Sequence, residues 1–134
     1  MPSPDYVQAN SGGRLHDAST PSISPLDRGF LYGDAIYEVW RTVGNRVFAF
    51  DEHWERLERS AGAIGMGLSY SQDRVRAEMG RTVAAYREQT GWDGSCYIRL
   101  QLSRGMGSLG LDAGLAEKPG FVIYVRKLIG LDPE

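Results

Sequence analysis

Residues 95–104, with the sequence SCYIRLQLSR, alternate between apolar and polar side chains along their length. Successive side chains of an extended strand point to opposite faces of the sheet. One face therefore receives the apolar set Cys96, Ile98, Leu100 and Leu102. The other face receives Tyr97, Arg99, Gln101 and Ser103. This pattern predicts a strand with one face in the protein core and a second, polar face.

Turn signals and β-branched or aromatic runs predict the other strands. Further strands are expected over residues 6–9, 35–43, 46–50 and 121–126, with tight turns at 10–13 and 44–45. The chain is expected to return as a hairpin at Arg14. Residues 27–34 hold two glycines and predict a folded loop or a single helical turn. Residues 105–120 hold five glycines and one proline, and predict a long loop.

Two helices are expected between the strands. Asp51 is the predicted N-cap of the first helix, and its apolar stripe comprises Trp54, Leu57, Ala61, Ile64 and Leu68. Ser71 is the predicted N-cap of the second helix, which ends at Gly91 and buries Val75, Met79, Val83 and Tyr86. The order of strands, two helices and strands predicts an α+β fold with a largely antiparallel sheet packed by the two helices.

Composition excludes several classes of protein. The chain has 134 residues, of which 42% are hydrophobic, and this fits one ordinary domain. No apolar run reaches the roughly 18 residues of a membrane span, and no signal peptide is expected because charged residues interrupt the first twenty positions. The net charge of −2 argues against nucleic-acid binding. A single cysteine, Cys96, favours a reducing cytoplasm, and with only His16 and His53 beside it, a metal site is not expected.

The polar face of strand 95–104 is a candidate binding surface. In strand 35–43, Tyr37, Val39 and Arg41 share one face, so two tyrosines and two arginines line a common surface if the two strands belong to one sheet. Guanidinium groups form bidentate hydrogen bonds to carboxylates and phosphates. We therefore expect an anion-recognising surface, with an ordinary solvated face as the alternative.

Arg56, His53 and the glycine-rich residues 105–108 are further candidates for a functional role. Arg56 lies on the flank of the first helix's apolar stripe, where a surface arginine covering the edge of the core is the alternative to a functional role. His53 lies nearer the stripe and is expected to be a hydrogen-bonded packing residue rather than a base. Residues 105–108, Gly-Met-Gly-Ser, form a weak phosphate-loop signal because no helix is expected to follow them.

Four blocks of sequence, in this order, resemble the N-terminal domain of class IV aminotransferases. They are LDRGFLYGDAIYE at 26–38, FDEHWERL at 50–57 with Ser60 and Ala61 behind it, YIR at 97–99, and RGMGSLGLD at 104–112. This fold-type IV family depends on pyridoxal 5'-phosphate (PLP). It includes branched-chain aminotransferases, D-amino acid aminotransferases and aminodeoxychorismate lyases. The resemblance covers nearly all of the chain.

The resemblance implies a role for particular residues. Arg56 matches the arginine that holds the cofactor phosphate. The Tyr97-x-Arg99 pair resembles that of branched-chain enzymes, where it helps to recognise the substrate carboxylate. Tyr37 and Arg41 fall at pocket-wall positions. Tyr32 matches an aromatic residue presented across a dimer, which implies a homodimer acting on an amino acid and a 2-oxo acid.

The chain departs from the family pattern at several positions. Val39 stands where branched-chain enzymes usually carry glycine and resembles the D-amino acid branch. Leu109 and Leu111, however, stand near where that branch supplies its carboxylate-binding Arg and His, so that pair is missing here. Neither Lys118 nor Lys127 matches the family's Schiff-base lysine, which lies in a second domain. Residues 1–134 are therefore expected to be one N-terminal domain, inactive alone.

The function expected of the longer enzyme is amino transfer between a branched-chain-type amino acid and a 2-oxo acid. An aminodeoxychorismate lyase-like enzyme is one alternative. A non-catalytic, stand-alone domain that dimerises or binds an anion is the other.

Overall fold

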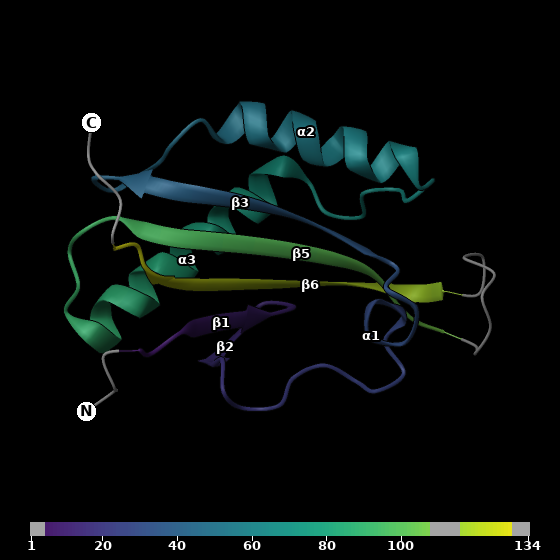
Figure 1. The fold of residues 1–134 in the computed structure, drawn as a ribbon, viewed down its shortest axis with the longest axis horizontal. Coiled ribbons are helices and arrows are strands. Elements are labelled where there is room, and N and C mark those ends of the chain that lie inside the picture. Colours follow the sequence, from purple (N-terminus) through teal and green to yellow (C-terminus); the bar gives the residue numbers. More distant parts are fainter. Residues whose placement is uncertain (1–4, 108–115, 130–134) are drawn as a thin grey trace.

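A computed structural model describes residues 5–107 and 116–129 of the chain. Its elements in chain order are β1 (Gln8–Ser11), β2 (Arg14–Asp17), α1 (Arg28–Tyr32), β3 (Ala35–Val43), β4 (Arg46–Val47), α2 (Phe50–Ala63), α3 (Gln72–Thr90), β5 (Cys96–Gly107) and β6 (Ala116–Lys127). Figure 1 shows one sheet with the two long helices against it. The α+β fold expected from the sequence is confirmed.

The six strands form one sheet in the order β2-β1-β6-β5-β3-β4, with antiparallel neighbours. β3 lies directly beside β5, where Val39 pairs with Arg99 and Arg41 pairs with Tyr97. The two strands that carry the predicted binding surface are therefore neighbours, in a register that places their tyrosines and arginines on one face. The first strand, β1, pairs with the last strand, β6.

The other face of the sheet carries the hydrophobic core. α2 packs on β3, and α3 packs across β1, β6 and β5. The side chains predicted to point inward from β5 are buried, with exposed fractions of 4% or less for Cys96, Ile98, Leu100 and Leu102. Trp54 and Leu57 of α2 and Met79 and Tyr86 of α3 complete the same core.

The start of α2 differs from the prediction. The strand expected over 46–50 ends at Val47, and the helix begins at Phe50 with Ala49 in the left-handed region at φ 55°. Asp51 is therefore a first-turn residue and not the N-cap. The physical reason is packing, since the Phe50 ring stacks between Trp40 and Trp54, with centroid separations of 5.6 and 6.0 Å.

The end of α2 differs from the prediction, whereas the caps of α3 agree with it. α2 ends at Ala63, so Ile64 lies outside the buried stripe and is 42% exposed, contrary to the prediction. Leu68 still packs against the core, but from the following loop. Both predicted caps of α3 are confirmed, because the Ser71 side chain accepts from the Arg74 N–H and Gly91 has φ 74°.

The strand boundaries also shift at three places. β1 covers residues 8–11 and not 6–9, and the hairpin return at Arg14 is confirmed. The long loop expected over 105–120 is partly wrong, because β5 continues to Gly107 and β6 begins at Ala116, with an irregularity between Ser103 and Met106. The shared pairing of the two long strands outweighs the glycine content there. Leu109, Leu111 and the rest of 108–115 lie outside the described residues.

Among residues 5–107 and 116–129, none of the helices combines the length and the apolar composition that a membrane span requires. No cluster of three or more His, Cys, Asp or Glu side chains suited to a metal ion is present in the same part.

Candidate functional site

The polar face of the sheet carries a continuous layer of tyrosines and arginines, here called the Tyr–Arg face. β3, β5 and β6 contribute its members, which are Tyr37, Arg41, Tyr97, Arg99, Tyr124 and Arg126. The Arg99 guanidinium lies 3.9 Å from the centre of the Tyr37 ring. Tyr97 stacks on Tyr124 at 6.0 Å and has the Arg126 guanidinium 4.4 Å from its ring centre. Four of the predicted site residues are thus brought onto one surface.

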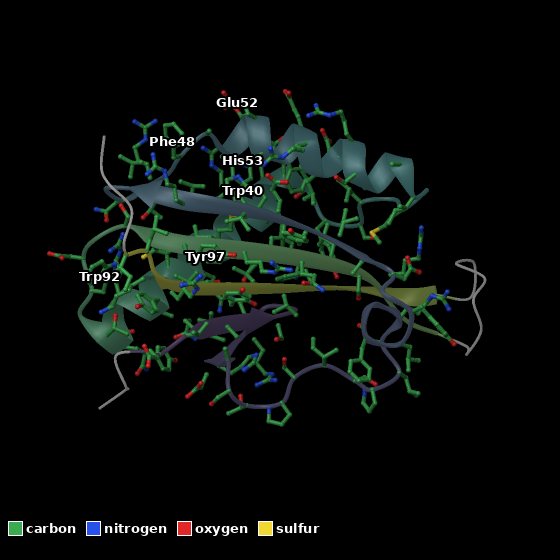
Figure 2. All side chains as sticks on the ribbon, viewed as in Figure 1. Trp40, Phe48, Glu52, His53, Trp92 and Tyr97 are labelled. Carbon is green, nitrogen blue, oxygen red and sulfur yellow. The ribbon has the colours of Figure 1, made fainter. Side chains whose placement is uncertain are left out.

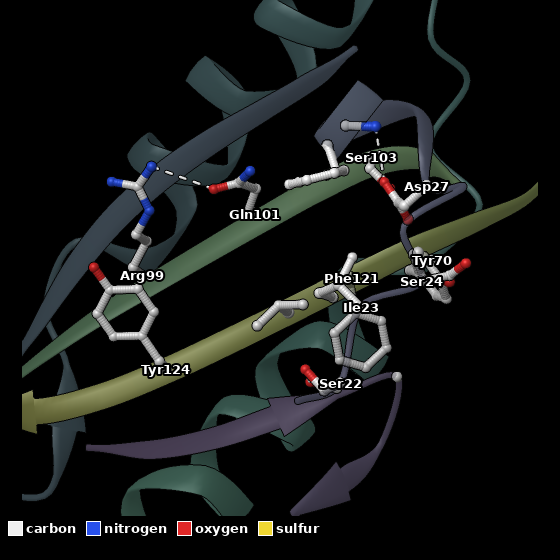
Figure 3. Close-up of a pocket in the computed structure, with 16 residues that line it drawn as sticks. Ser22, Ile23, Ser24, Asp27, Tyr70, Arg99, Gln101, Ser103, Phe121 and Tyr124 are labelled. Atoms are coloured by element: carbon white, nitrogen blue, oxygen red, sulfur yellow. Dashed lines mark hydrogen bonds between the residues drawn. The ribbon is translucent and has the colours of Figure 1, made fainter. Parts of the chain in front are cut away.

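Among the arginines of this face, Arg99 is the one that lines a cavity, and it is the candidate for binding an anion. Its side chain is half-buried, and Nη2 donates to Oε1 of Gln101 at 3.3 Å, as Figure 3 shows. In the described part of the chain no carboxylate lies within ion-pair distance of it. A planar guanidinium that is held by a ring and an amide, without an acidic partner, is ready to receive a carboxylate.

Tyr124 is a site residue that the sequence reasoning missed. It pairs with Arg99 across β5 and β6, and burial together with the neighbouring Tyr97 raises the pKa of its hydroxyl. The sequence does contain a signal for Tyr124. The alternation in strand 121–126 places Phe121, Ile123 and Val125 inward and Tyr124 on the opposite face.

A cavity of about 730 Å³ lies beside Arg99 on the Tyr–Arg side of the sheet. Arg99 and Tyr124 line it together with the polar groups of Ser22, Ser24 and Ser103 and the apolar groups of Ile23, Phe30 and Val122. The acid Asp27 also lines the cavity and accepts a hydrogen bond from Ser103 at 3.0 Å. Figure 3 shows both residues at the end of the cavity away from Arg99. The arrangement is suited to a small anion with an apolar substituent.

Arg56 lies apart from the Tyr–Arg face, on α2. Its Nε donates to the two carboxylate oxygens of Glu38 at 3.2 and 3.0 Å, and its Nη2 donates to the same group. His53 Nδ1 lies 2.6 Å from Oε2 of Glu38, and Figure 2 shows His53 between α2 and β3, next to Trp40. His53 is a hydrogen-bonded packing residue, as expected. No pattern in the sequence predicted that Glu38 binds Arg56.

The electrostatics of this cluster centre on Glu38, whose side chain is only 6% exposed. Burial alone would raise its pKa, but the hydrogen bonds and positive charge of Arg56 and His53 outweigh burial and lower the pKa. Glu38 is therefore ionised at neutral pH. The side chain of Arg56 is 59% exposed, and its Nη1 makes no hydrogen bond within the described ranges.

Tyr32 lies at the end of α1, in a turn fixed by ion pairs. The Asp27 side chain accepts from the Gly29 N–H, and Gly33 ends the helix in the left-handed region. Arg28 is 2% exposed, binds Asp34 at 3.2 Å and lies 4.8 Å from the Tyr32 ring centre. The ring of Tyr32 therefore rests on a buried, ion-paired arginine and is 38% exposed.

Arg104 joins this turn to α2. Its Nε binds Asp34 at 2.8 Å, and its terminal nitrogens donate to the carbonyls of Ile64 and Gly65, just after the helix.

Of the two lysines in the sequence, Lys127 has a described side chain. Lys127 Nζ lies 4.7 Å from the Trp92 ring centre, and the Lys118 side chain lies outside the described residues.

Comparison with known proteins places this fold in a family. Residues 35–129 match the family model described as amino-transferase class IV. This chain therefore belongs to the class IV aminotransferase family, whose members are PLP-dependent.

The relatives of this chain have different enzyme names. The D-alanine aminotransferase of Bacillus licheniformis is 37% identical over 93 residues, which are 69% of this chain and 31% of the relative. The aminodeoxychorismate lyase of Bacillus subtilis is 28% identical over 116 residues, 87% of this chain and 39% of the relative. The chain thus spans between about a third and two fifths of these relatives.

Solved structures show the same fold. A fold IV transaminase from Curtobacterium pusillum superposes with a TM-score of 0.77 at 22% identity, over 94% of this chain and 43% of that one. A branched-chain aminotransferase from Thermoproteus uzoniensis gives a TM-score of 0.68 at 25% identity, over 90% of this chain and 40% of the other.

Proposed function

We propose that residues 1–134 are the N-terminal domain of a PLP-dependent aminotransferase that transfers an amino group between an amino acid and a 2-oxo acid. The observation that carries the proposal is Arg99. It is half-buried beside a cavity and has no acidic partner in the described part of the chain. Both substrates of this reaction carry a carboxylate, which Arg99 and the neighbouring Tyr97 would bind and orient.

The residues present fit the phosphate end of PLP at Arg56. Its guanidinium is exposed, its Nε and Nη2 are held by Glu38, and Nη1 remains to donate to a phosphate oxygen. When bound, PLP supplies an electron sink for the bonds at the amino acid's α-carbon. The role of this chain is to hold the PLP phosphate at Arg56 and the substrate carboxylate at Arg99. In the family the lysine that attaches the cofactor lies in a second domain.

We further propose a branched-chain-type amino acid as the donor. The Tyr97-x-Arg99 pair supports this choice, as do the apolar residues Ile23, Phe30 and Val122 in the cavity. D-alanine is the alternative donor, supported by the 37% identity to a D-alanine aminotransferase and by Val39. Lyase activity on aminodeoxychorismate is a third candidate, supported by the match over 87% of the chain.

The test uses the full-length protein loaded with PLP. Leucine, valine and D-alanine are each supplied with 2-oxoglutarate, and glutamate formation is measured; aminodeoxychorismate is supplied separately. Arg99→Ala is expected to raise KM for the amino acid about tenfold or more, since a charge-assisted hydrogen bond contributes about 1.5–3 kcal/mol. Arg46→Ala, an exposed arginine on β4, is the control. An unchanged KM in Arg99→Ala would contradict the proposal, and turnover of aminodeoxychorismate alone would favour the lyase.

The 134-residue chain alone is proposed not to transaminate. Lys127 engages the Trp92 ring at the end of β6, away from Arg56 on α2. The chain is mixed with PLP, leucine and 2-oxoglutarate, with Lys118→Ala and Lys127→Ala as controls. Turnover above that of free PLP, lost on replacing one lysine, would contradict this proposal.

The full-length protein is proposed to be a homodimer. Large apolar or aromatic side chains are exposed on this domain, with exposed fractions of 73% for Phe30, 55% for Tyr37 and 52% for Phe48. Exposed apolar side chains that gather into a patch are typical of association surfaces. Light scattering is expected to give twice the monomer mass, and a monomer at high micromolar concentration would contradict the proposal.

A further inference from the structure

Glu38 is an acid on the face of the sheet that packs against the helices. Its neighbours along β3 that point the same way are Ile36 and Trp40, and across β5 it pairs with Leu100. A charge in such surroundings is costly unless it is paired and hydrogen-bonded. Glu38 is paired twice, with Arg56 and with His53.

The proton positions in this cluster follow from the geometry. An ionised carboxylate only accepts hydrogen bonds, so the 2.6 Å contact between His53 Nδ1 and Glu38 Oε2 requires a proton on Nδ1. Nη2 of Arg56 lies 3.2 Å from the same Nδ1. Both nitrogens are donors that converge on Oε2 of Glu38. His53 and Glu38 thus fix where the Arg56 guanidinium can lie.

The orientation of the Arg56 guanidinium determines which of its N–H donors is available to a ligand. The Nε–Nη2 edge is used by Glu38, so Nη1 is the terminal nitrogen left for a ligand. A lysine has a single nitrogen at its end, so it cannot bind Glu38 with one edge and present a separate nitrogen to an external anion, as the guanidinium does.

We propose that Glu38 is a positioning residue for phosphate binding, which presents Nη1 of Arg56 to the phosphate monoester of PLP. The inference rests on the proposed function. It also has a geometric consequence on β3. Glu38 lies between Tyr37 and Val39, which point to the Tyr–Arg face. One strand therefore sets the position of the phosphate-binding arginine and of the Tyr37 ring that holds Arg99.

The test is a double-mutant cycle in the full-length protein, with binding of PLP and of pyridoxal, which lacks the phosphate, measured by fluorescence. Glu38→Gln is expected to weaken PLP binding about fivefold or more, as for residues that share one network, and to leave pyridoxal binding unchanged. In an Arg56→Ala background the same substitution is expected to have no further effect. Arg56→Lys is expected to behave like Arg56→Ala.

The controls separate the possible failures. Glu52→Gln, an exposed acid of α2, is expected to bind both compounds like wild type. Equal loss of PLP and pyridoxal binding in Glu38→Gln would reduce Glu38 to a structural role and overturn the inference. Unchanged PLP binding in Arg56→Ala would instead overturn the phosphate role of Arg56 in the proposed function. If Glu38→Gln does not fold, Glu38→Asp, which keeps the charge but retracts it, is expected to show the same phosphate-selective loss, and its absence would overturn the inference.

Discussion

Replacing Gly29 with alanine is predicted to destabilise the fold, because the added methyl group has no room between α1 and the sheet. A Cβ at Gly29 would lie 2.9 Å from Cβ of Ser103, 3.0 Å from Oδ1 of Asp27 and 3.4 Å from Cβ of Ala35. The Ser103 and Ala35 atoms are fixed to strand backbones and cannot move by changing rotamer. The Asp27 oxygen is the one that caps α1, at 2.7 Å from the Gly29 N–H. Gly29→Ala must therefore push α1 away from β5.

The expected cost of this change is about 2 kcal/mol, within the range of about 1–3 kcal/mol for overpacking. With a urea m-value of about 2 kcal/mol/M, the unfolding midpoint falls by about 1 M. Urea unfolding of the chain, followed by fluorescence of the buried Trp40 and Trp54, measures it.

Gly80→Ala is the matched control. Gly80 lies within α3, and a Cβ there meets nothing within 4 Å. Since alanine is favoured over glycine in a helix by about 1 kcal/mol, this variant is expected to be stabilised. The reasoning fails if Gly29→Ala unfolds within about 0.2 M of wild type, or if the two substitutions shift the midpoint in the same direction.

The remaining predictions concern the core and one acid. Leu57→Ala removes a side chain with no exposed surface and is expected to cost about 2–5 kcal/mol in urea unfolding; a loss below 1 kcal/mol would contradict its place in the core. Asn10→Ala deletes the hydrogen bonds to Glu78, Thr82 and the Gly13 N–H, and a loss of about 1–3 kcal/mol is expected in the same assay. Hydrogen bonding by Asn10 lowers the pKa of Glu78 from 4.5. The ionised Glu78 therefore stabilises the fold above pH 4.5, and this stabilisation is lost as the pH falls through the lowered pKa. Urea midpoints at pH 7 and pH 3 are therefore expected to differ less in Glu78→Gln than in wild type, and an equal difference would contradict this.

The local pattern of the sequence predicted the strands and the faces they present. Alternation over 95–104 identified both the core side chains and Arg99, because a strand has a fixed side-chain period of two. The start of α2 was missed because a cap signal at Asp51 is weaker than the packing of Phe50 between two tryptophans. Tertiary contacts of that kind override local propensity.

The candidate site was predicted only in part for a related reason. Periodicity can assign Glu38 to the inward face, but it cannot say that a helix will bring His53 and Arg56 to it from 15 and 18 positions further along the chain. Tyr124 could have been assigned to the binding face by the same period-two argument used for Arg99. The order of strands was not predictable from local signals, because β1 and β6 meet from opposite ends of the described chain.

The pairing of β1 with β6 sets an order of events during synthesis on the ribosome. β6 lies between β1 and β5, so the nascent sheet stays in two parts until residues 116–127 have emerged. Until then the edges of β1 and β5 are open to pairing with other chains. Contacts between segments so distant in sequence also slow folding. A nascent chain whose β6 has not yet left the ribosome keeps both edges open, and this is the stage at which a chaperone would be most needed.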